Sequence, residues 1–550
     1  YSSNTNALGN TITYEREPVF GNILKEKNIL GHETIYNYDN NGNLKQATYP
    51  NAIVYTELKW NTQIADPNQL DEKTELFYKR IVGSNAPDVI KYYNKYGQEL
   101  RTEIDDINGK KVCTKAIYNP TDLSLNKNIK PYFSGSINEN KSVKYSYDNL
   151  KRLTKVEDEN KTIKSYTYDG RKTTESINGE DYTKTINELG QLVEAKDKGG
   201  LIQYKYNSQG LPRKITYNDN HIVALYYDIN GNRTKIVDPN AGTITNEYNS
   251  FNQVTKQTDA KGNVTEYKYD DFGRILEVKA PNNRIITYDY NKDGNGIEQI
   301  KSIELKENDL VNHKESYDYD TYGRVIKVTT IIKDNTYERS FVYDLHGNLT
   351  EETTPSGLKI VRHYNSKGFN TKVTATDENN KSYNIWEFGA SEADGRIVNY
   401  KMGKDNMIDR TYNYDSYGYL SRITSNVTKN NGGQKKIQDF TYAFNEITGN
   451  IISRTSFIKK NNVIEPKTEI FSYDELDRLT KVDNNIISYN INGNIEYKSD
   501  IGTYEYDATK LNAVTKVTPK TPKTKPISIN DQYIEYTTFG KVSKITEDKN

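Results

Sequence analysis

The chain has 550 residues, and its 75 Lys+Arg balance its 75 Asp+Glu, so the formal net charge is zero. A neutral chain offers no overall electrostatic footprint for nucleic acid and no basic surface for anionic lipid, so we expect neither as a partner. No stretch approaches the roughly 18 to 20 consecutive apolar residues that span a bilayer, and we expect no membrane span.

Tyrosine dominates the composition, with 47 Tyr against 13 Phe, 2 Trp and 2 Met. Hydrophobic residues make up only 34% of the chain and its mean hydropathy is −0.90. Such a chain buries little apolar surface to offset backbone entropy. Tyrosine, however, is a strand former whose ring covers sheet surface while its hydroxyl stays hydrated or bonded. The composition therefore favours extensive β-sheet whose faces are partly exposed to solvent.

A short pattern recurs along the chain. Its first clear copy is Tyr36-Asn-Tyr38-Asp39, followed by Asn41-Gly42. Further along, the second aromatic of the pattern returns in four equal steps of 21 residues, at Tyr206, Tyr227, Tyr248, Tyr269 and Tyr290. Asp or Asn follows each of these tyrosines, and Gly or Asn stands four residues after each. The repeat-defining structural residues that we single out are Tyr38, Asp39, Gly42, Tyr206, Gly210, Tyr227, Asp228, Gly231, Tyr269, Asp270, Gly273, Tyr319, Asp320, Gly323, Tyr343, Asp344, Gly347, Tyr414, Asp415 and Gly418.

Each part of the repeat has a mechanical reason. In Tyr267-Lys-Tyr269, the period of two places both rings on one face of a strand. Asp270 can then bond its side chain to backbone two residues on, and Gly273 supplies the positive φ of a tight reversal. A return strand at 274–278 and a second turn at 281–283 follow. One repeat therefore predicts one β-hairpin, with two strands of about seven residues.

Isolated hairpins are not stable in water, so these hairpins must pair edge to edge into one long sheet. Right-handed twist makes such a sheet curl, and too few large aliphatic residues are present to fill a solid barrel. We therefore expect an all-β fold of repeated hairpins in a sheet that wraps around an interior space. The segments 429–433 and 518–526 predict surface loops, the second in extended polyproline geometry.

Catalytic and metal sites find little support. The segment Asp289–Gly294 begins like a calcium loop, but Ile300 stands where a bidentate Glu is needed. The acidic pairs at 105–106 and 270–271 would point to opposite faces of a strand, so we interpret them as turn residues. Cys113 cannot form an intramolecular disulfide and has no His nearby, which indicates a free, partly buried thiol. We expect no catalytic residues, no metal and no cofactor.

Two tryptophans leave an alternative open. Trp60 and Trp386 both lie in irregular repeats. A large ring that fills a gap in the packing is the interpretation we favour, and a platform on which a sugar stacks is the alternative.

The pattern Tyr-x-Tyr-Asp-x-x-Gly-Arg/Asn-Leu/Ile, seen at 36–44, 267–275, 317–325 and 412–420, resembles the YD repeat of the Rhs/YD-repeat family. That family includes bacterial Rhs polymorphic toxins, wall-associated proteins, cocoon subunits of insecticidal toxin complexes, and animal teneurins. The resemblance covers nearly the whole chain. It implies a hollow shell formed by a spiralling β-sheet, in a secreted or cell-surface bacterial protein.

The resemblance also indicates which part of such a protein this is. The chain lacks the Asp-Pro-x-Gly core that ends the shell in toxin members, because Asp66-Pro and Asp238-Pro have no Gly at the required place. The self-cleaving aspartates of the family therefore match no residue here. The start at Tyr1, without a methionine or a signal peptide, suggests a part cut from a longer protein. We interpret residues 1–550 as a single YD-repeat shell segment without the core and cargo.

Two functions follow from the resemblance. In the first, the chain is a non-enzymatic shell that encloses the C-terminal toxin or other cargo polypeptide of its parent, with export machinery as a further partner. In the second, it is a cell-surface scaffold for adhesion or for binding carbohydrate or protein. Loops such as 429–434 and 520–525 would then make the contacts.

Overall fold

The structure is a computed structural model. It describes residues 2–61, 73–136, 141–158, 161–177, 179–218, 221–428, 432–460, 463–508, 510–520, 530–537 and 541–547. Over these residues the chain is all-β, with 47 strands in one sheet and one short 3₁₀ turn, Lys404–Asn406. The predicted fold class of repeated hairpins in a long antiparallel sheet is confirmed. Much of the loop segments predicted at 429–433 and 518–526 lies outside the described residues.

The chain divides into two compact units, each built from segments that are far apart in the sequence. Unit 1 comprises Tyr1–Thr162, Ile286–Asn413 and Ile423–Gln438, and unit 2 comprises Ile163–Ile285, Tyr414–Arg422 and Asp439–Asn550. Each unit therefore holds an earlier and a later run of strands.

The earlier run of unit 1 consists of β1 (Ser2–Thr5), β2 (Thr11–Arg16), β3 (Ile23–Lys27), β4 (Glu33–Tyr38), β5 (Leu44–Tyr49), β6 (Ala52–Trp60), β7 (Phe77–Gly83), β8 (Val89–Tyr93), β9 (Glu99–Asp105), β10 (Lys111–Tyr118), β11 (Leu125–Phe133), β12 (Ser142–Tyr147) and β13 (Leu153–Asp158). The later run consists of β27 (Ile300–Glu307), β28 (Leu310–Tyr319), β29 (Val325–Ile332), β30 (Asn335–Tyr343), β31 (Leu349–Thr353), β32 (Lys359–Tyr364), β33 (Asn370–Thr376), β34 (Ser382–Ser391), β35 (Ile397–Met402) and β36 (Ile408–Tyr414).

The earlier run of unit 2 consists of β14 (Lys161–Asp169), β15 (Lys172–Ile177), β16 (Glu180–Ile186), β17 (Leu192–Asp197), β18 (Gly200–Tyr206), β19 (Pro212–Tyr217), β20 (His221–Tyr227), β21 (Arg233–Asp238), β22 (Gly242–Tyr248), β23 (Val254–Thr258), β24 (Val264–Tyr269) and β25 (Ile275–Ala280). The later run consists of β38 (Gln434–Phe444), β39 (Ile451–Lys460), β40 (Val463–Tyr473), β41 (Leu479–Val482), β42 (Asn485–Tyr489), β43 (Ile495–Lys498), β44 (Gly502–Tyr506), β45 (Val514–Pro519), β46 (Gln532–Tyr536) and β47 (Val542–Glu547). The chain passes between the units within β14, β26 (Arg284–Tyr290), β37 (Leu420–Thr428) and β38, and at the last residue of β36. The part of β38 up to Gln438 belongs to unit 1.

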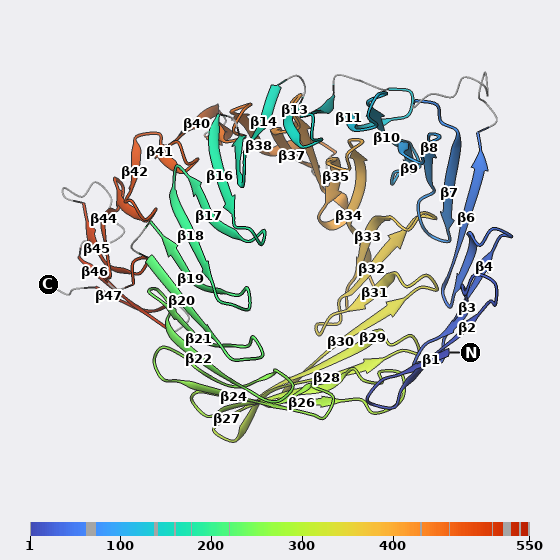
Figure 1. Cartoon of the computed structure of the whole chain (residues 1–550), viewed down its shortest axis with the longest axis horizontal. Helices are drawn as coiled ribbons and strands as arrows, with labels where there is room; N and C mark the ends of the chain where they lie inside the picture. Colours follow the sequence, from blue (N-terminus) through green and yellow to red (C-terminus); the bar gives the residue numbers. More distant parts are fainter. Residues whose placement is uncertain are drawn as a thin grey trace. The chain divides into compact units, whose positions relative to one another are not determined.

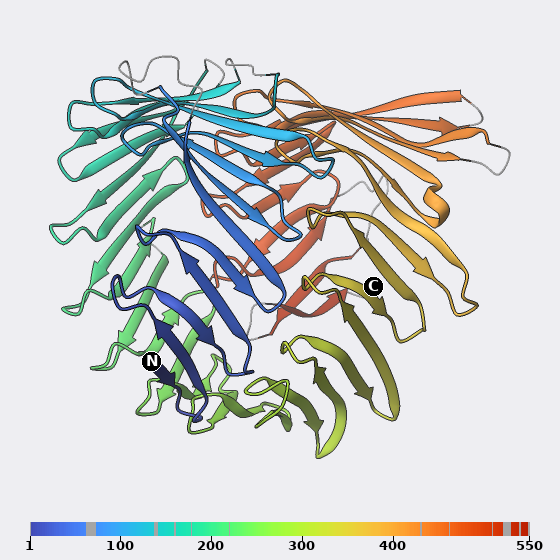
Figure 2. The same ribbon diagram turned by 90° about the vertical axis from the view of Figure 1, so that its right-hand side faces the viewer.

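Within each run every strand pairs antiparallel with the next strand along the chain. Hairpins β28–β29, β30–β31 and β32–β33 show this arrangement, lying side by side in chain order (Figures 1 and 2). Each of these three hairpins turns after a strand-final Tyr and an Asp or Asn, and we call turns of this kind the Tyr-Asp turns. Linker turns at the other ends of the strands join one hairpin to the next.

A β-bulge lies beside many of the Tyr-Asp turns. In β24–β25 the partner of Lys268 is Glu277 while that of Tyr269 is Ile275, so one residue of β25 is left without a partner. The same shift precedes the strand-final tyrosine of β4, β18, β20, β22, β28, β30 and β32. Bulges increase local right-handed twist, so each of these repeats adds twist at the same edge.

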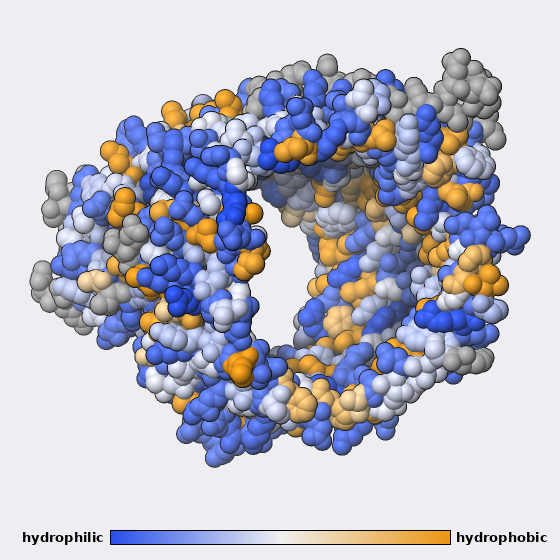
Figure 3. All heavy atoms as spheres, viewed as in Figure 1, coloured by the Kyte–Doolittle hydropathy of each residue, from blue (hydrophilic) through white to orange (hydrophobic). Residues whose placement is uncertain are grey.

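The sheet has little fully buried core. Among the described residues, the buried apolar ones are Ala47, Leu100, Val112, Cys113, Ile129, Val156, Leu225, Ala375 and Val517. Hydrophobic and hydrophilic side chains are intermixed over the face drawn in Figure 3. Strand pairing and the bonds at the strand ends must therefore supply much of the stability.

The strand-final tyrosine bonds to the strand that precedes its own. The hydroxyl of Tyr269, at the end of β24, donates to the carbonyl oxygen of Val254, at the start of β23, over 2.8 Å. The same bond is made by Tyr38, Tyr206, Tyr227, Tyr248, Tyr319, Tyr343 and Tyr364, at 2.6–3.1 Å. β23 and β24 are joined by a linker turn at their other ends only, so the tyrosine ties the ends that the chain leaves unconnected. Partial burial raises the pKa of Tyr269, which keeps the phenol protonated as a donor.

We predict that Tyr269→Phe loosens this end of the strand pair. Loss of one hydrogen bond should lower the local opening free energy by about 1 kcal/mol. Hydrogen exchange of the amides of β23 and β24 measures this opening. The matched control is Tyr226→Phe, because Tyr226 is 51% exposed and its hydroxyl has no hydrogen-bond partner among the described residues. Equal loss of protection in the two variants would show that the hydroxyl bond does not hold the strand ends.

Candidate functional site

The Tyr-Asp turns are built around one carboxylate. In the turn after β24, Asp270 Oδ1 accepts the backbone N–H groups of Phe272 at 3.0 Å and Arg274 at 2.8 Å. Asp270 Oδ2 accepts Arg274 Nε at 2.7 Å. Gly273 has φ +84°, which a residue with a Cβ adopts only under strain. One acidic side chain thus satisfies two turn amides and fixes the arginine that follows.

The sequence-predicted repeat residues all occupy equivalent places. Each predicted tyrosine is the last residue of a strand: Tyr38, Tyr206, Tyr227, Tyr269, Tyr319, Tyr343 and Tyr414. Each predicted aspartate accepts hydrogen bonds from the backbone N–H groups of the residues two and four positions after it: Asp39, Asp228, Asp270, Asp320, Asp344 and Asp415. Positive φ values of 75° to 90° are found at Gly42, Gly210, Gly231, Gly273, Gly323, Gly347 and Gly418. Each set stays in its own turn, so these residues line sheet edges and do not converge on one cavity.

Many linker turns use the same chemistry, which the sequence analysis missed. Asp259 Oδ1 accepts the amides of Lys261 and Asn263, both at 2.9 Å, and Gly262 has φ +80°. The signal was the Asp-x-x-Gly spacing at 259–262, offset from the Tyr-Asp pattern. Both edges of the sheet are therefore lined by turns of one kind.

In unit 1, turns of the later run contact linker turns of the earlier run. Glu298, between β26 and β27, accepts Asn6 Nδ2 at 2.6 Å and also bonds Asn10 Nδ2. His32 Nε2 donates to the carbonyl oxygen of Thr321 over 2.6 Å, and its ring stacks on Tyr322 with centroids 4.7 Å apart. The bonded partners of the Glu298 and Thr321 contacts are 288–292 residues apart. We call this row of contacts the unit 1 seam.

Unit 2 has a seam of the same kind. Asn512 N donates to Asn240 Oδ1 at 3.0 Å, and Lys261 Nζ donates to the carbonyl oxygen of Tyr536 at 2.8 Å. These partners are 272 and 275 residues apart. Eleven hairpins, from β24–β25 to β44–β45, and strand β46 lie between Lys261 and the end of Tyr536's strand, so the number of hairpins in the interval sets which turns meet.

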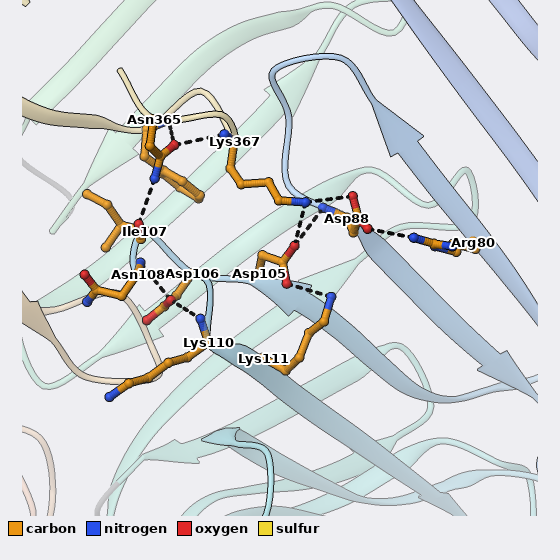
Figure 4. Close-up of polar contacts among 11 residues, drawn as sticks. Arg80, Asp88, Asp105, Asp106, Ile107, Asn108, Lys110, Lys111, Asn365 and Lys367 are labelled. Carbon is orange, nitrogen blue, oxygen red and sulfur yellow. Dashed lines mark hydrogen bonds and ion pairs between the residues drawn. The ribbon is translucent and has the colours of Figure 1, made fainter. Parts of the chain in front are cut away.

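The unit 1 seam contains a cluster of five charged residues (Figure 4). Lys367 Nζ lies 3.0 Å from Asp88 Oδ1 and 3.0 Å from Asp105 Oδ2. Arg80 Nη2 lies 2.9 Å from the other oxygen of Asp88, and Lys111 Nζ lies 2.6 Å from the other oxygen of Asp105. Lys367 belongs to the turn between β32 and β33, whereas the other four residues lie on or between β7 and β10. The lysine therefore joins two distant parts of the chain.

The electrostatics of this cluster favour the charged forms. Asp105 is 6% exposed. Burial by itself would raise its pKa, but the bonds from Lys111 and Lys367 outweigh burial and hold the pKa below the usual value. The pKa of Lys367 is raised by its bonds to Asp88 and Asp105. Both carboxylates are committed to cations, so the cluster acts as an electrostatic clamp.

The backbone packs closely beside this clamp. Asn365 Nδ2 donates to the carbonyl oxygen of Ile107 at 2.8 Å (Figure 4). A Cβ at Gly368, where φ is +78°, would lie 2.4 Å from the carbonyl oxygen of Asn85. Glycine therefore permits the close approach of the two turns.

The structure also shows the positions of the acidic pair at 105–106 and of Cys113, which the sequence singled out. Asp106 Oδ1 accepts amides in a linker turn, but Asp105 ends β9 and joins the clamp, so the turn interpretation does not apply to Asp105. Cys113 is free and 2% exposed, and burial raises the pKa of its thiol. The described residues contain no group of three or more His, Cys, Asp or Glu placed to hold a metal ion.

No helix in the described part of the chain is long and apolar enough to cross a membrane.

Comparison with known proteins identifies the repeat and the fold. Residues 248–285 match the RHS Repeat family. No curated protein matches the sequence. The chain is similar to the crystal structure of TcdB2-TccC3-TEV, with 12% identity and a TM-score of 0.78 over 99% of this chain and 37% of that one. The chain therefore contains the RHS repeat, and the resemblance to Rhs/YD-repeat proteins is confirmed.

Two further structures share the fold. TcdB2-TccC3 without the hypervariable C-terminal region is 12% identical, with a TM-score of 0.66 over 100% of this chain and 37% of that one. A Tc holotoxin pore of Photorhabdus luminescens, mutated in TccC3, is 12% identical, with a TM-score of 0.63 over 99% of this chain and 36% of that one. The chain thus spans little more than a third of the solved chains it matches, and its fold is that of the matched part.

We predict that acid opens the Tyr-Asp turns selectively. The pKa of Asp270 lies below its usual value. Partial burial raises this pKa, but the hydrogen bonds from the Arg274 amide and guanidinium lower it by more. The pKa of Asp320 is lowered in the same way by Arg324. A carboxylate with a lowered folded pKa stabilises the turn fully above its unfolded pKa of about 3.9. That stabilisation is lost as the pH falls through the folded pKa. Protection of the turn amides should be constant from pH 7 to 5 and fall below pH 4.

Turns with Asn in place of Asp are the internal control. Asn207 Oδ1 accepts the amides of Gln209 and Leu211 at 3.0 and 2.9 Å, the same geometry without a titrating group. Hydrogen exchange is measured at pH 6 and pH 2.5 and corrected for intrinsic rates. At pH 2.5 the amides of the Asp270 turn should lose protection, and those of the Asn207 turn should keep it. Equal loss at both turns would contradict a carboxylate origin.

We predict that Lys367→Ala opens the unit 1 seam. The substitution leaves two carboxylates without their shared cation, and a partly buried ion pair of this kind should contribute about 2 kcal/mol, between exposed and fully buried pairs. Hydrogen exchange at 84–88 and 105–110 should rise. Lys381→Ala is the control, because Lys381 is exposed and its ammonium contacts no described residue. Unchanged exchange in Lys367→Ala would show that the clamp does not hold the turns together.

Proposed function

We propose that this chain is wall material of a secreted shell that encloses a C-terminal polypeptide of its parent protein. The observation that carries the proposal is the fold match to TcdB2-TccC3-TEV over 99% of the chain. The seams support it, because turns that meet 272–292 residues apart join successive runs of one sheet at their edges.

The surface chemistry of the sheet suits a container. A wall with few buried apolar residues and mixed polar faces can hold an unfolded chain without offering it an adhesive apolar surface. It also keeps proteases away from that chain by steric exclusion. Such a wall needs no chemical step of its own, so we assign the chain no enzymatic activity. An extracellular setting fits this role.

A surface scaffold is the second candidate, and one observation favours it. Trp60 is 69% exposed and lies edge-on to Phe77, with ring centroids 5.9 Å apart. Phe77 in turn stacks on Tyr93 at 5.1 Å. A row of rings across β6–β8 with an exposed end is a surface on which a sugar or a partner protein can pack.

Protease protection of the natural protein that contains this chain separates the two functions. We predict that a segment C-terminal to Asn550 resists added protease under native conditions and is digested once the protein is denatured. Intact mass and a denaturing gel identify the fragments and show whether the segment is cleaved but retained. Digestion of that segment at the same rate in native and denatured protein would reject the shell and favour the scaffold.

A further inference from the structure

Three aromatic side chains form a row across β34, β35 and β36. Trp386 and Tyr400 have ring centroids 6.5 Å apart and planes inclined by 38°. Tyr400 and Tyr412 are 6.0 Å apart, with planes inclined by 28°. All three residues are half-buried, so part of each remains open to solvent. We call them the Trp386 row.

An arginine lies within this row. Arg410 pairs with Tyr400 across β35 and β36, so both side chains are on one face. Its Nη1 donates to the Tyr400 hydroxyl at 3.3 Å, and its Nε donates to Ser425 Oγ at 3.1 Å. Its Nη2 donates to Gln438 Oε1 at 2.6 Å. Because Ser425 is 1% exposed, the guanidinium is anchored to a fixed point of the sheet.

The charge of Arg410 is not neutralised within the described part of the chain. All three of its acceptors are neutral, whereas twelve other arginines of that part form ion pairs with carboxylates. Asp409 is adjacent in sequence but on the other face, where it accepts Asn399 Nδ2 at 2.6 Å. A guanidinium has five N–H donors, so two remain for an external acceptor.

We propose that this face of β34–β36 binds an acidic sugar, with its carboxylate on Arg410 and its ring on the Trp386 row. A guanidinium with a fixed orientation matches the two oxygens of a carboxylate. Aromatic faces pack against the C–H groups of a sugar ring, and the hydroxyls of Tyr400 and Tyr412 can bond sugar hydroxyls. An acidic polypeptide would satisfy the charge but would leave the row of rings unused.

Tryptophan fluorescence tests this site in the full chain. The chain has 2 Trp, so a Trp60→Phe background leaves Trp386 as the only reporter. The probes are trigalacturonic acid, a neutral trisaccharide of the same linkage, and an oligoglutamate peptide. We expect a saturable change in Trp386 emission with the acidic sugar and none with the neutral one.

Variants of the site should then separate its parts. Arg410→Gln should weaken binding of the acidic sugar at least tenfold, and Arg410→Lys nearly as much, because lysine lacks the planar fork. Tyr412→Phe, which removes only a hydroxyl, should weaken it a few-fold. Arg454→Gln is the control, since Arg454 is already paired with Glu469, and it should leave binding unchanged. Circular dichroism and thermal unfolding confirm that each variant is folded.

Three results would overturn the proposal. The first is no binding of trigalacturonic acid at millimolar concentration by the folded protein. The second is equal binding of the neutral trisaccharide, which would remove the role of Arg410. The third is oligoglutamate binding of equal strength that Trp386→Ala leaves unchanged, which would assign the site to acidic peptides. If Arg410→Gln does not fold, Tyr412→Phe and the selectivity of the unmutated site decide the question.

Discussion

The structure depends on closing the ends of its strands. A sheet with so few buried residues gains little from a dry core, so strand ends would fray unless they were tied. Two side chains, the tyrosine and the aspartate, tie them at a Tyr-Asp turn. Asp270 holds the turn amides within its hairpin, and Tyr269 reaches the start of the preceding strand at Val254. The Tyr-Asp pair therefore has one function within a repeat and another between repeats.

The local part of this design could be predicted from the sequence. Alternation in Tyr267-Lys-Tyr269, the Asp after it and a glycine four residues on define the strand, its end and its turn. The acceptor of the Tyr269 hydroxyl could not be predicted, because it depends on how neighbouring strands are aligned. Asp105 shows the limit: its sequence neighbours favoured a turn, but its ion pairs are with Lys111 and a lysine from another run of strands.

The seams and the Arg410 site could not be predicted for the same physical reason. Their residues meet only after strands have paired and later turns have met earlier ones. Lys367 and Asp88 are 279 residues apart and neither carries a local signal of the other. The partners of Arg410 come from three other strands, β35, β37 and β38, and the carboxylate nearest to it in sequence is turned away by strand alternation. Composition suggested only that Trp386 was unusual.

The seams also constrain how such a chain can change in length. A hairpin is a local unit, and by its own bonds one copy more or fewer would be tolerated. Yet Lys261 meets Tyr536 only because a set number of hairpins lies between them. Inserting one hairpin within that interval would move every later turn past its partner, whereas lengthening a loop away from the seam would not. Gain and loss of whole repeats should therefore be restricted, while loop insertions remain free to accumulate.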